Sequence, residues 1–209
     1  MTDKYTYCEN HSGEESKALQ EINRDTYARV LKPRMLSGHL QGRVLSLLSK
    51  LVNPQYILEV GTYTGYSAIC LAEGLKANGQ LFTIEANEEY EEIIKKNISK
   101  AALNDKISLI LGNALDVIPN LKQTFDLVFI DADKLNYSKY YQLAIEKTNI
   151  GGIIISDNVL WDNKVLDSNA KDKTTQHLRE FNQELHQDKR TEKVLLPIRD
   201  GLFVSRKIK

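Results

Sequence analysis

The 209-residue sequence has only two cysteines, no net charge and no long hydrophobic run. Cys8 and Cys70 are too few for a disulfide framework and lack metal-ligand spacing, which favours a reduced, cytoplasmic setting. Basic and acidic residues both number 28, so no general excess of positive charge is available to bind a polyanion such as a nucleic acid. The N-terminal residues 1–5 are polar and indicate neither a signal peptide nor a membrane span.

Internal repeats, low-complexity tracts and linkers are also absent, which favours a single domain over residues 1–209. Residues 14–30 form a charged amphipathic pattern, and residues 38–51 repeat apolar side chains at helical spacing. We therefore expect residues 1–52 to form a helical cap region. The four prolines lie where secondary-structure elements could join rather than inside periodic segments.

From residue 56 onward, short apolar runs alternate with helical patterns. The predicted strands are residues 56–60, 81–84, 107–111, 125–130, 152–156, 194–197 and 201–205. The predicted helices are residues 65–77, 88–100, 137–147 and 174–186. Strands that alternate with helices predict an α/β fold with a Rossmann-like, doubly wound, mostly parallel sheet of seven strands, and the last pair predicts an antiparallel terminal strand.

A glycine turn, Gly61-Thr-Tyr-Thr-Gly65, follows the first strand. Ligands of such sheets bind beyond the carboxyl ends of the strands, where glycine lets the backbone approach them closely. A nicotinamide fingerprint would need a glycine where Tyr63 stands. With Glu59 before the turn and Glu85 placed to bind ribose hydroxyls, the pattern favours S-adenosylmethionine (SAM), which has no phosphate and a cationic amino-acid end. A tight turn that binds no ligand is the alternative.

Polar side chains follow two later strands. Asp131 and Asp133 come after residues 125–130, and Asp157 and Asn158 end the strand predicted at 152–156. If these strands are neighbours, three oxygen donors converge beside the glycine turn, a set that suits Mg²⁺ and also Mn²⁺ or Ca²⁺. Helix caps and solvated carboxylates are the alternative. Strand alternation predicts that Asp133 points away from this set.

Lys134 lies three residues after Asp131, within reach of a substrate held by a metal ion. A hydroxyl bound to a cation loses its proton more easily, because the cation stabilises the oxyanion. A neighbouring lysine with a lowered pKa can accept that proton. The alternative is an ordinary solvated surface charge.

Four stretches in this order, residues 58–68, 125–137, 156–161 and 199–202, resemble the cation-dependent class I O-methyltransferases, the group that contains the caffeoyl-CoA and catechol enzymes. The resemblance runs from about Lys32 to the C-terminus and implies SAM and a divalent cation as cofactors. It implies cofactor contacts from Met35, Ser37, Glu59, Gly61, Thr62, Tyr63, Ser67, Glu85, Ala114 and Asp131. It also implies metal ligation by Asp131, Asp157 and Asn158, catalysis by Lys134, and acceptor contacts from Lys134, Trp161 and Asp162.

We therefore expect a metal-dependent O-methyltransferase that acts on a small catechol-type phenol. Plant caffeoyl-CoA enzymes carry tyrosines and arginines before the late helix, and residues 168–177 have neither, which disfavours an acyl-CoA acceptor. One alternative is a tRNA hydroxyuridine O-methyltransferase, with Lys171, Lys173, Lys189 and Arg190 as possible phosphate contacts. A second alternative is a nicotinamide-dependent oxidoreductase. The family resemblance also suggests a homodimer.

Overall fold

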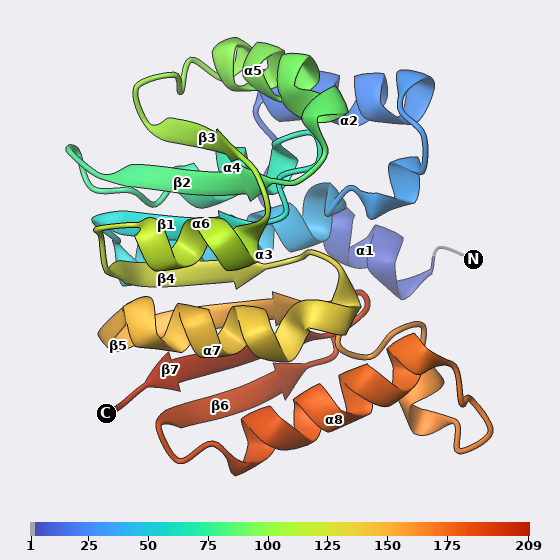
Figure 1. Cartoon of the computed structure of the whole chain (residues 1–209). Coiled ribbons are helices and arrows are strands. Elements are labelled where there is room, and N and C mark those ends of the chain that lie inside the picture. The colour runs from blue at the N-terminus through green and yellow to red at the C-terminus, as the bar shows by residue number, and fades with distance from the viewer. Residues whose placement is uncertain (1–2) are drawn as a thin grey trace.

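The computed structural model describes residues 3–209. Its strands are β1 (Tyr56–Val60), β2 (Gln80–Glu85), β3 (Ile107–Leu111), β4 (Phe125–Ile130), β5 (Thr148–Asp157), β6 (Thr191–Leu196) and β7 (Leu202–Lys207). They form one sheet in the order β3-β2-β1-β4-β5-β7-β6, in which β7 runs antiparallel to both of its neighbours (Figure 1). The predicted seven-stranded, mostly parallel α/β sheet with an antiparallel terminal strand is confirmed.

Helices cover both faces of this sheet (Figure 1). They are α1 (Lys4–Asn10), α2 (Lys17–Arg29), α3 (Gly38–Val52), α4 (Tyr66–Ala72), α5 (Glu91–Lys100), α6 (Ala114–Asn120), α7 (Tyr137–Lys147) and α8 (Lys173–Gln187). Short 3-10 helices are η1 (Pro33–Met35), η2 (Glu88–Tyr90), η3 (Lys134–Asn136) and η4 (Lys164–Leu166). Side chains of α3, α4 and α5 pack on one face of the sheet and those of α6, α7 and α8 on the other. Within residues 3–209, no helix has the length and apolar character needed to cross a bilayer.

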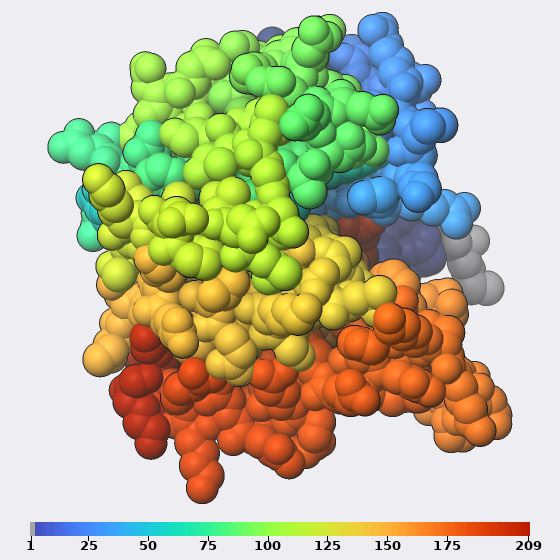
Figure 2. All heavy atoms as spheres, viewed as in Figure 1, coloured from blue at the N-terminus to red at the C-terminus, as the bar shows by residue number. Residues whose placement is uncertain are grey.

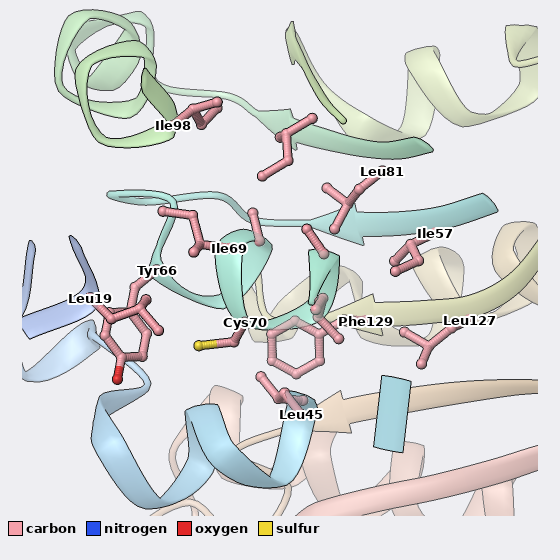
Figure 3. Packing of buried hydrophobic residues seen from close by; sticks show 14 of the residues in the cluster. Leu19, Leu45, Ile57, Tyr66, Ile69, Cys70, Leu81, Ile98, Leu127 and Phe129 are labelled. Atoms are coloured by element: carbon pink, nitrogen blue, oxygen red, sulfur yellow. The ribbon is translucent and has the colours of Figure 1, made fainter. Parts of the chain in front are cut away.

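Strand alternation explains how the two faces are filled. On β1, Leu58 and Val60 belong to the core with α6, α7 and α8, whereas Ile57 belongs to the core with α3 and α4. Figure 3 shows the core on the α3 and α4 side of the sheet, where Leu45 of α3 and Cys70 of α4 lie near Phe129 of β4. Because helices cover both faces, the open ends of the strands are where the sheet can build a ligand site.

Two local predictions were wrong. The helix expected over residues 65–77 ends at Ala72, and Gly74, two residues later, lies so close to α3 that a Cβ there would be 2.3 Å from Ser49. The sequence pattern also does not predict α6, which has only seven residues and contains Pro119. Pro119 therefore lies inside a helix rather than at a join. A helix this short spans about two turns, too few to establish a clear hydrophobic periodicity.

The hydrogen-bond register places four parallel strand ends at one level. Val60 of β1 pairs with Ile84 of β2 and with Ile130 of β4, and Ile130 pairs with Ser156 of β5. The residues that follow these partners therefore lie side by side at one edge of the sheet. They are Gly61, Glu85, Asp131 and Asp157.

Candidate active site

A cavity of about 1180 Å³ lies beyond the carboxyl ends of β1, β2 and β4. On this side of the molecule, Figure 2 shows a recess between the blue N-terminal part and the orange segment before α8. Twelve of the predicted site residues line the cavity: Met35, Ser37, Gly61, Thr62, Tyr63, Ser67, Glu85, Ala114, Asp131, Lys134, Asn158 and Trp161. Three others, Glu59, Asp157 and Asp162, lie outside its wall. The first two are completely buried, and Asp162 is exposed.

The glycine turn is fixed by close backbone contacts. Gly61 has a φ of +96°, and a Cβ at this position would lie 2.0 Å from the carbonyl oxygen of Asp131, so only glycine fits. The backbone N–H groups of Thr62 and Tyr63 donate to the Glu85 carboxylate at 3.2 and 2.8 Å. Glu85, predicted to bind ribose hydroxyls, therefore also ties the end of β2 to the turn while it lines the cavity.

Glu59 lies directly behind the turn and is fully buried. The Thr83 hydroxyl donates to its Oε2 at 2.5 Å, and its Oε1 has no hydrogen-bond partner within residues 3–209. Burial raises the pKa of Glu59 to about 8, and the negative charges of Asp131 and Glu85 add to the effect. A buried carboxyl group with a free acceptor fits a cationic group such as the amino-acid end of SAM.

Asp131, Asp157 and Asn158 form what we call the acidic edge of the sheet, and Lys134 lies beside Asp131. Its ammonium group donates to Oδ1 of Asp131 at 2.9 Å and to the hydroxyl of Tyr137 at 2.5 Å. Only 8% of the Lys134 side chain is exposed, so it is not the solvated surface charge of the alternative interpretation. The Tyr137 hydroxyl in turn donates to the carbonyl oxygen of Asp157 at 3.0 Å. The sequence did not indicate this contact, because a tyrosine at the start of a helix has the pattern of a packing residue.

Asp157 is the most deeply buried member of the acidic edge. Its Oδ1 accepts the backbone N–H of Asn158 at 2.7 Å, and its Oδ2 accepts the side-chain amide of Gln41 at 2.5 Å. Burial and, to a smaller extent, the nearby charge of Asp131 raise the pKa of Asp157, Lys134 opposes them, and the net pKa is about 7. Two carboxylates therefore lie close together with one lysine as the compensating charge.

The chemistry of this set fits a hard divalent cation. Asp131, Asp157 and Asn158 offer oxygen donors alone, which Mg²⁺, Mn²⁺ and Ca²⁺ prefer. A cation would offset the mutual repulsion that raises the pKa of Asp157. Within residues 3–209 no three His, Cys, Asp or Glu side chains form a metal cluster, and the set has only two such residues beside its amide.

Asp133 lines the cavity, and the prediction that it points away from the three candidate metal ligands stays a prediction. β4 ends at Ile130, so alternation does not extend into the loop. The Tyr140 hydroxyl donates to Oδ1 of Asp133 at 2.5 Å, and the Asn136 amide donates to Oδ2 at 2.7 Å. Asp133 therefore belongs to a fixed polar group in the cavity wall.

The opposite wall is formed by irregular backbone. Trp161, Asp162 and Asn163 have consecutive positive φ angles of 50°, 51° and 60°, a conformation that costs about 1–2 kcal/mol per residue. The backbone N–H of Asp162 donates to Asp200 at 2.6 Å, which holds this turn. Arg199 donates to the carbonyl oxygen of Ser37 at 2.7 Å and so ties the N-terminal region to the same wall.

None of the four basic residues considered for tRNA contact, Lys171, Lys173, Lys189 and Arg190, lines the cavity wall, although Thr174, next to Lys173, does. Arg190 is also paired with Asp188 at 2.7 Å. These residues are therefore not part of the proposed site itself.

Comparison with known proteins matches this chain to the O-methyltransferase family over residues 9–208. A catechol O-methyltransferase from Niastella koreensis is 38% identical over 180 residues, which span 84% of this chain and 81% of that protein. A caffeoyl-CoA O-methyltransferase from Petroselinum crispum is 35% identical and covers 93% of this chain and 85% of its own length. The crystal structure of the O-methyltransferase from Bacillus cereus in complex with SAH is 31% identical, with a TM-score of 0.88 and coverage of 96% of both chains.

Proposed function

The chain belongs to the O-methyltransferase family and is a SAM-dependent O-methyltransferase, and from this premise we propose that it methylates one hydroxyl of a small catechol-type acceptor with the help of a divalent cation. The single observation that carries the proposal is the convergence of Asp131, Lys134, Asp157 and Asn158 at one edge of the sheet, beside the cavity. The family match rules out the nicotinamide-dependent alternative.

The metal ligands in this proposal are Asp131, Asp157 and Asn158, with Mg²⁺ as the first expectation and Mn²⁺ or Ca²⁺ as the others. When bound, the cation supplies positive charge that holds both oxygens of a vicinal diol and stabilises the oxyanion. The carboxylates of Asp131 and Asp157 suit this role because only one positively charged side chain, that of Lys134, offsets their two negative charges.

Lys134 is the proposed base and also contacts the acceptor. Its Nζ is held by Asp131 and Tyr137 at the cavity wall. As the neutral amine it would accept the hydroxyl proton at this fixed position and become the ammonium. The oxyanion would then form a bond to the methyl carbon of SAM while the bond from that carbon to sulfur breaks, and the demethylated cofactor would leave as a neutral thioether. Alignment of the two reactants and electrostatic stabilisation of the oxyanion supply most of the rate gain.

The glycine turn and its surroundings are the proposed SAM site. We expect Glu85 to bind the ribose hydroxyls and Ala114 to border the adenine, with Glu59 near the amino-acid end. Met35, Ser37, Gly61, Thr62, Tyr63, Ser67 and Asp131 complete the proposed contacts. The volume of about 1180 Å³ leaves room for an acceptor beside the cofactor, against Trp161, with Asp162 as the next residue outside the cavity wall.

An acceptor panel tests this proposal. Purified protein with SAM and Mg²⁺ is incubated with catechol, caffeate and caffeoyl-CoA, and products are identified by mass. A matched control is p-coumarate, which lacks the second hydroxyl. We expect monomethylation of catechol and caffeate only. Equal methylation of p-coumarate would show that a vicinal diol is not required, and methylation of bulk tRNA alone would favour the tRNA alternative.

We further propose that residues 1–209 form one methyltransferase domain with residues 1–52 as its helical cap, and that the protein is a cytoplasmic homodimer. The support for the dimer is the resemblance to the family, and for the cytoplasm it is the scarcity of cysteine. Light scattering coupled to size-exclusion chromatography gives the oligomeric state. A monomer at micromolar concentration would contradict the dimer.

A further inference from the structure

Gln41 of α3 reaches the acidic edge from outside the cavity wall. Its Nε2 donates to Oδ2 of Asp157 at 2.5 Å, across 116 positions of the chain. The two residues are 1% and 0% exposed, so water does not compete for this contact. No sequence motif indicates it, because a glutamine within an amphipathic helix resembles any other polar residue.

This contact fixes the orientation of the Asp157 carboxylate. Oδ2 accepts from Gln41, and Oδ1 accepts from the backbone N–H of Asn158 at 2.7 Å. A carboxylate has about four lone-pair sites, so each oxygen keeps one for a further partner. Two donors on two different oxygens prevent rotation of the group and leave both remaining sites in a defined direction.

Packing alone does not explain a glutamine at this position. Its Oε1 is buried and has no hydrogen-bond partner within residues 3–209. A buried acceptor without a donor destabilises the folded protein, a cost that methionine or leucine would avoid. The Gln41 amide therefore destabilises the fold through its unpaired oxygen and makes one hydrogen bond, which is to the proposed metal ligand Asp157.

We infer that Gln41 is a positioning residue for the divalent cation, which it serves by orienting Asp157. This inference rests on the proposed function, in which Asp157 is a metal ligand. Groups that hydrogen-bond to metal ligands fix ligand direction, and their loss typically weakens metal binding about 10- to 100-fold. Gln41 gives the N-terminal helical region a part in the cation site.

Calorimetric titration of the protein with Mn²⁺ in the absence of acceptor tests the role of Gln41. Gln41→Met keeps the side-chain length and removes the donor. Gln41→Asn keeps the amide but shortens the side chain by one methylene, which withdraws it from Asp157. We expect both variants to bind Mn²⁺ with a Kd raised about 10- to 100-fold. SAM affinity, measured separately, should stay within about twofold of the wild type if only the cation site is affected.

Ser49→Ala is the matched control on the same helix. Ser49 is buried and donates to the carbonyl oxygen of Leu71 at 2.6 Å, so its loss weakens α3 packing without touching Asp157. We expect Ser49→Ala to lower the melting temperature and leave the Mn²⁺ Kd unchanged. Circular dichroism confirms that each variant is folded before titration.

The outcomes separate the inference from the proposed function. If the wild type binds Mn²⁺ and both Gln41 variants bind it with the same affinity, the role of Gln41 is overturned, while the proposed metal site is retained. A Ser49→Ala variant that loses Mn²⁺ affinity equally would assign the effect to helix packing and also overturn it. No Mn²⁺ binding by the wild type would overturn the metal site itself, and with it the inference.

Discussion

The two sides of the cavity are built in different ways. The proposed cofactor side consists of regular strand ends and a glycine turn, joined by backbone contacts such as those from Thr62 and Tyr63 to Glu85. The proposed acceptor side consists of loops, with three consecutive left-handed residues from Trp161 held by Asp200. The acidic edge, with Asp131 and Lys134, lies between them.

This difference teaches why the methyl donor was easier to infer than the acceptor. A strand end and its turn follow from short local patterns, and the sheet register then fixes their neighbours. A loop wall depends on contacts between distant segments, such as Arg199 with the carbonyl oxygen of Ser37. Loops also vary more than the elements that they connect, and they carry much of the specificity.

Replacement of Lys134 by methionine should have the largest effect and separates the two sides. The variant keeps the aliphatic stem and loses the amine that contacts Asp131 and Tyr137. We expect kcat to fall about 10²- to 10⁴-fold because proton removal is lost. The SAM Kd should stay within about twofold of the wild type, since Lys134 serves the acceptor. An unchanged kcat would remove Lys134 from its proposed role.

Gly61→Ala should be the next most damaging change, and it acts on the cofactor side. The new Cβ would lie 2.0 Å from the carbonyl oxygen of Asp131, so the turn and the acidic edge must separate. We expect the free energy of unfolding to fall by about 3 kcal/mol, with weaker SAM binding. Gly13→Ala is the control, because a Cβ there has no atom within 4 Å. Equal stability of the two variants in urea unfolding would contradict the expectation.

Trp161→Ala should have a smaller effect, confined to the acceptor side. An aromatic contact with the acceptor ring contributes about 0.5–1.5 kcal/mol, so we expect the acceptor KM to rise about 3- to 10-fold. The SAM Kd should not change. Steady-state kinetics with caffeate and a separate SAM titration give both values. A loss of SAM affinity equal to the loss of acceptor affinity would remove the proposed division between the two sides.

The pH dependence of stability should show the smallest effect. Burial raises the pKa of Glu59 to about 8, above its ordinary value of 4.5. The folded protein therefore holds this proton more tightly than the unfolded chain, and the stabilisation is full below about pH 4.5 and lost as pH rises through about 8. We expect the ligand-free protein to unfold at a lower temperature at pH 8 than at pH 6.

Glu59→Gln should flatten part of this slope, because glutamine does not titrate. The raised pKa of Asp157, at about 7, adds a slope of the same sign from the acidic edge. Asp157→Asn in the same series therefore apportions the pH dependence between the two sides. If the melting temperatures of both variants change with pH as steeply as that of the wild type, both assignments are contradicted.

Most regular elements and twelve of the residues that line the cavity could be predicted from the sequence. Strands β1, β2 and β4 follow from apolar runs, and residues directly after them come together because parallel strand ends share an edge. Gln41 and Tyr137 could not be predicted, since their roles depend on which side chain lies opposite them in the folded chain. The orientation of Asp133 could not be predicted from strand alternation, because β4 ends three residues earlier.

The most direct test of the central claim is the rate of caffeate methylation before and after removal of divalent cations. The enzyme is assayed with SAM and Mg²⁺, treated with EDTA, and then supplied with excess Mg²⁺, while the methylated product is quantified by mass. We expect EDTA to abolish methylation and Mg²⁺ to restore it. A full rate after chelation would contradict the role of Asp131, Asp157 and Asn158 as metal ligands in this reaction.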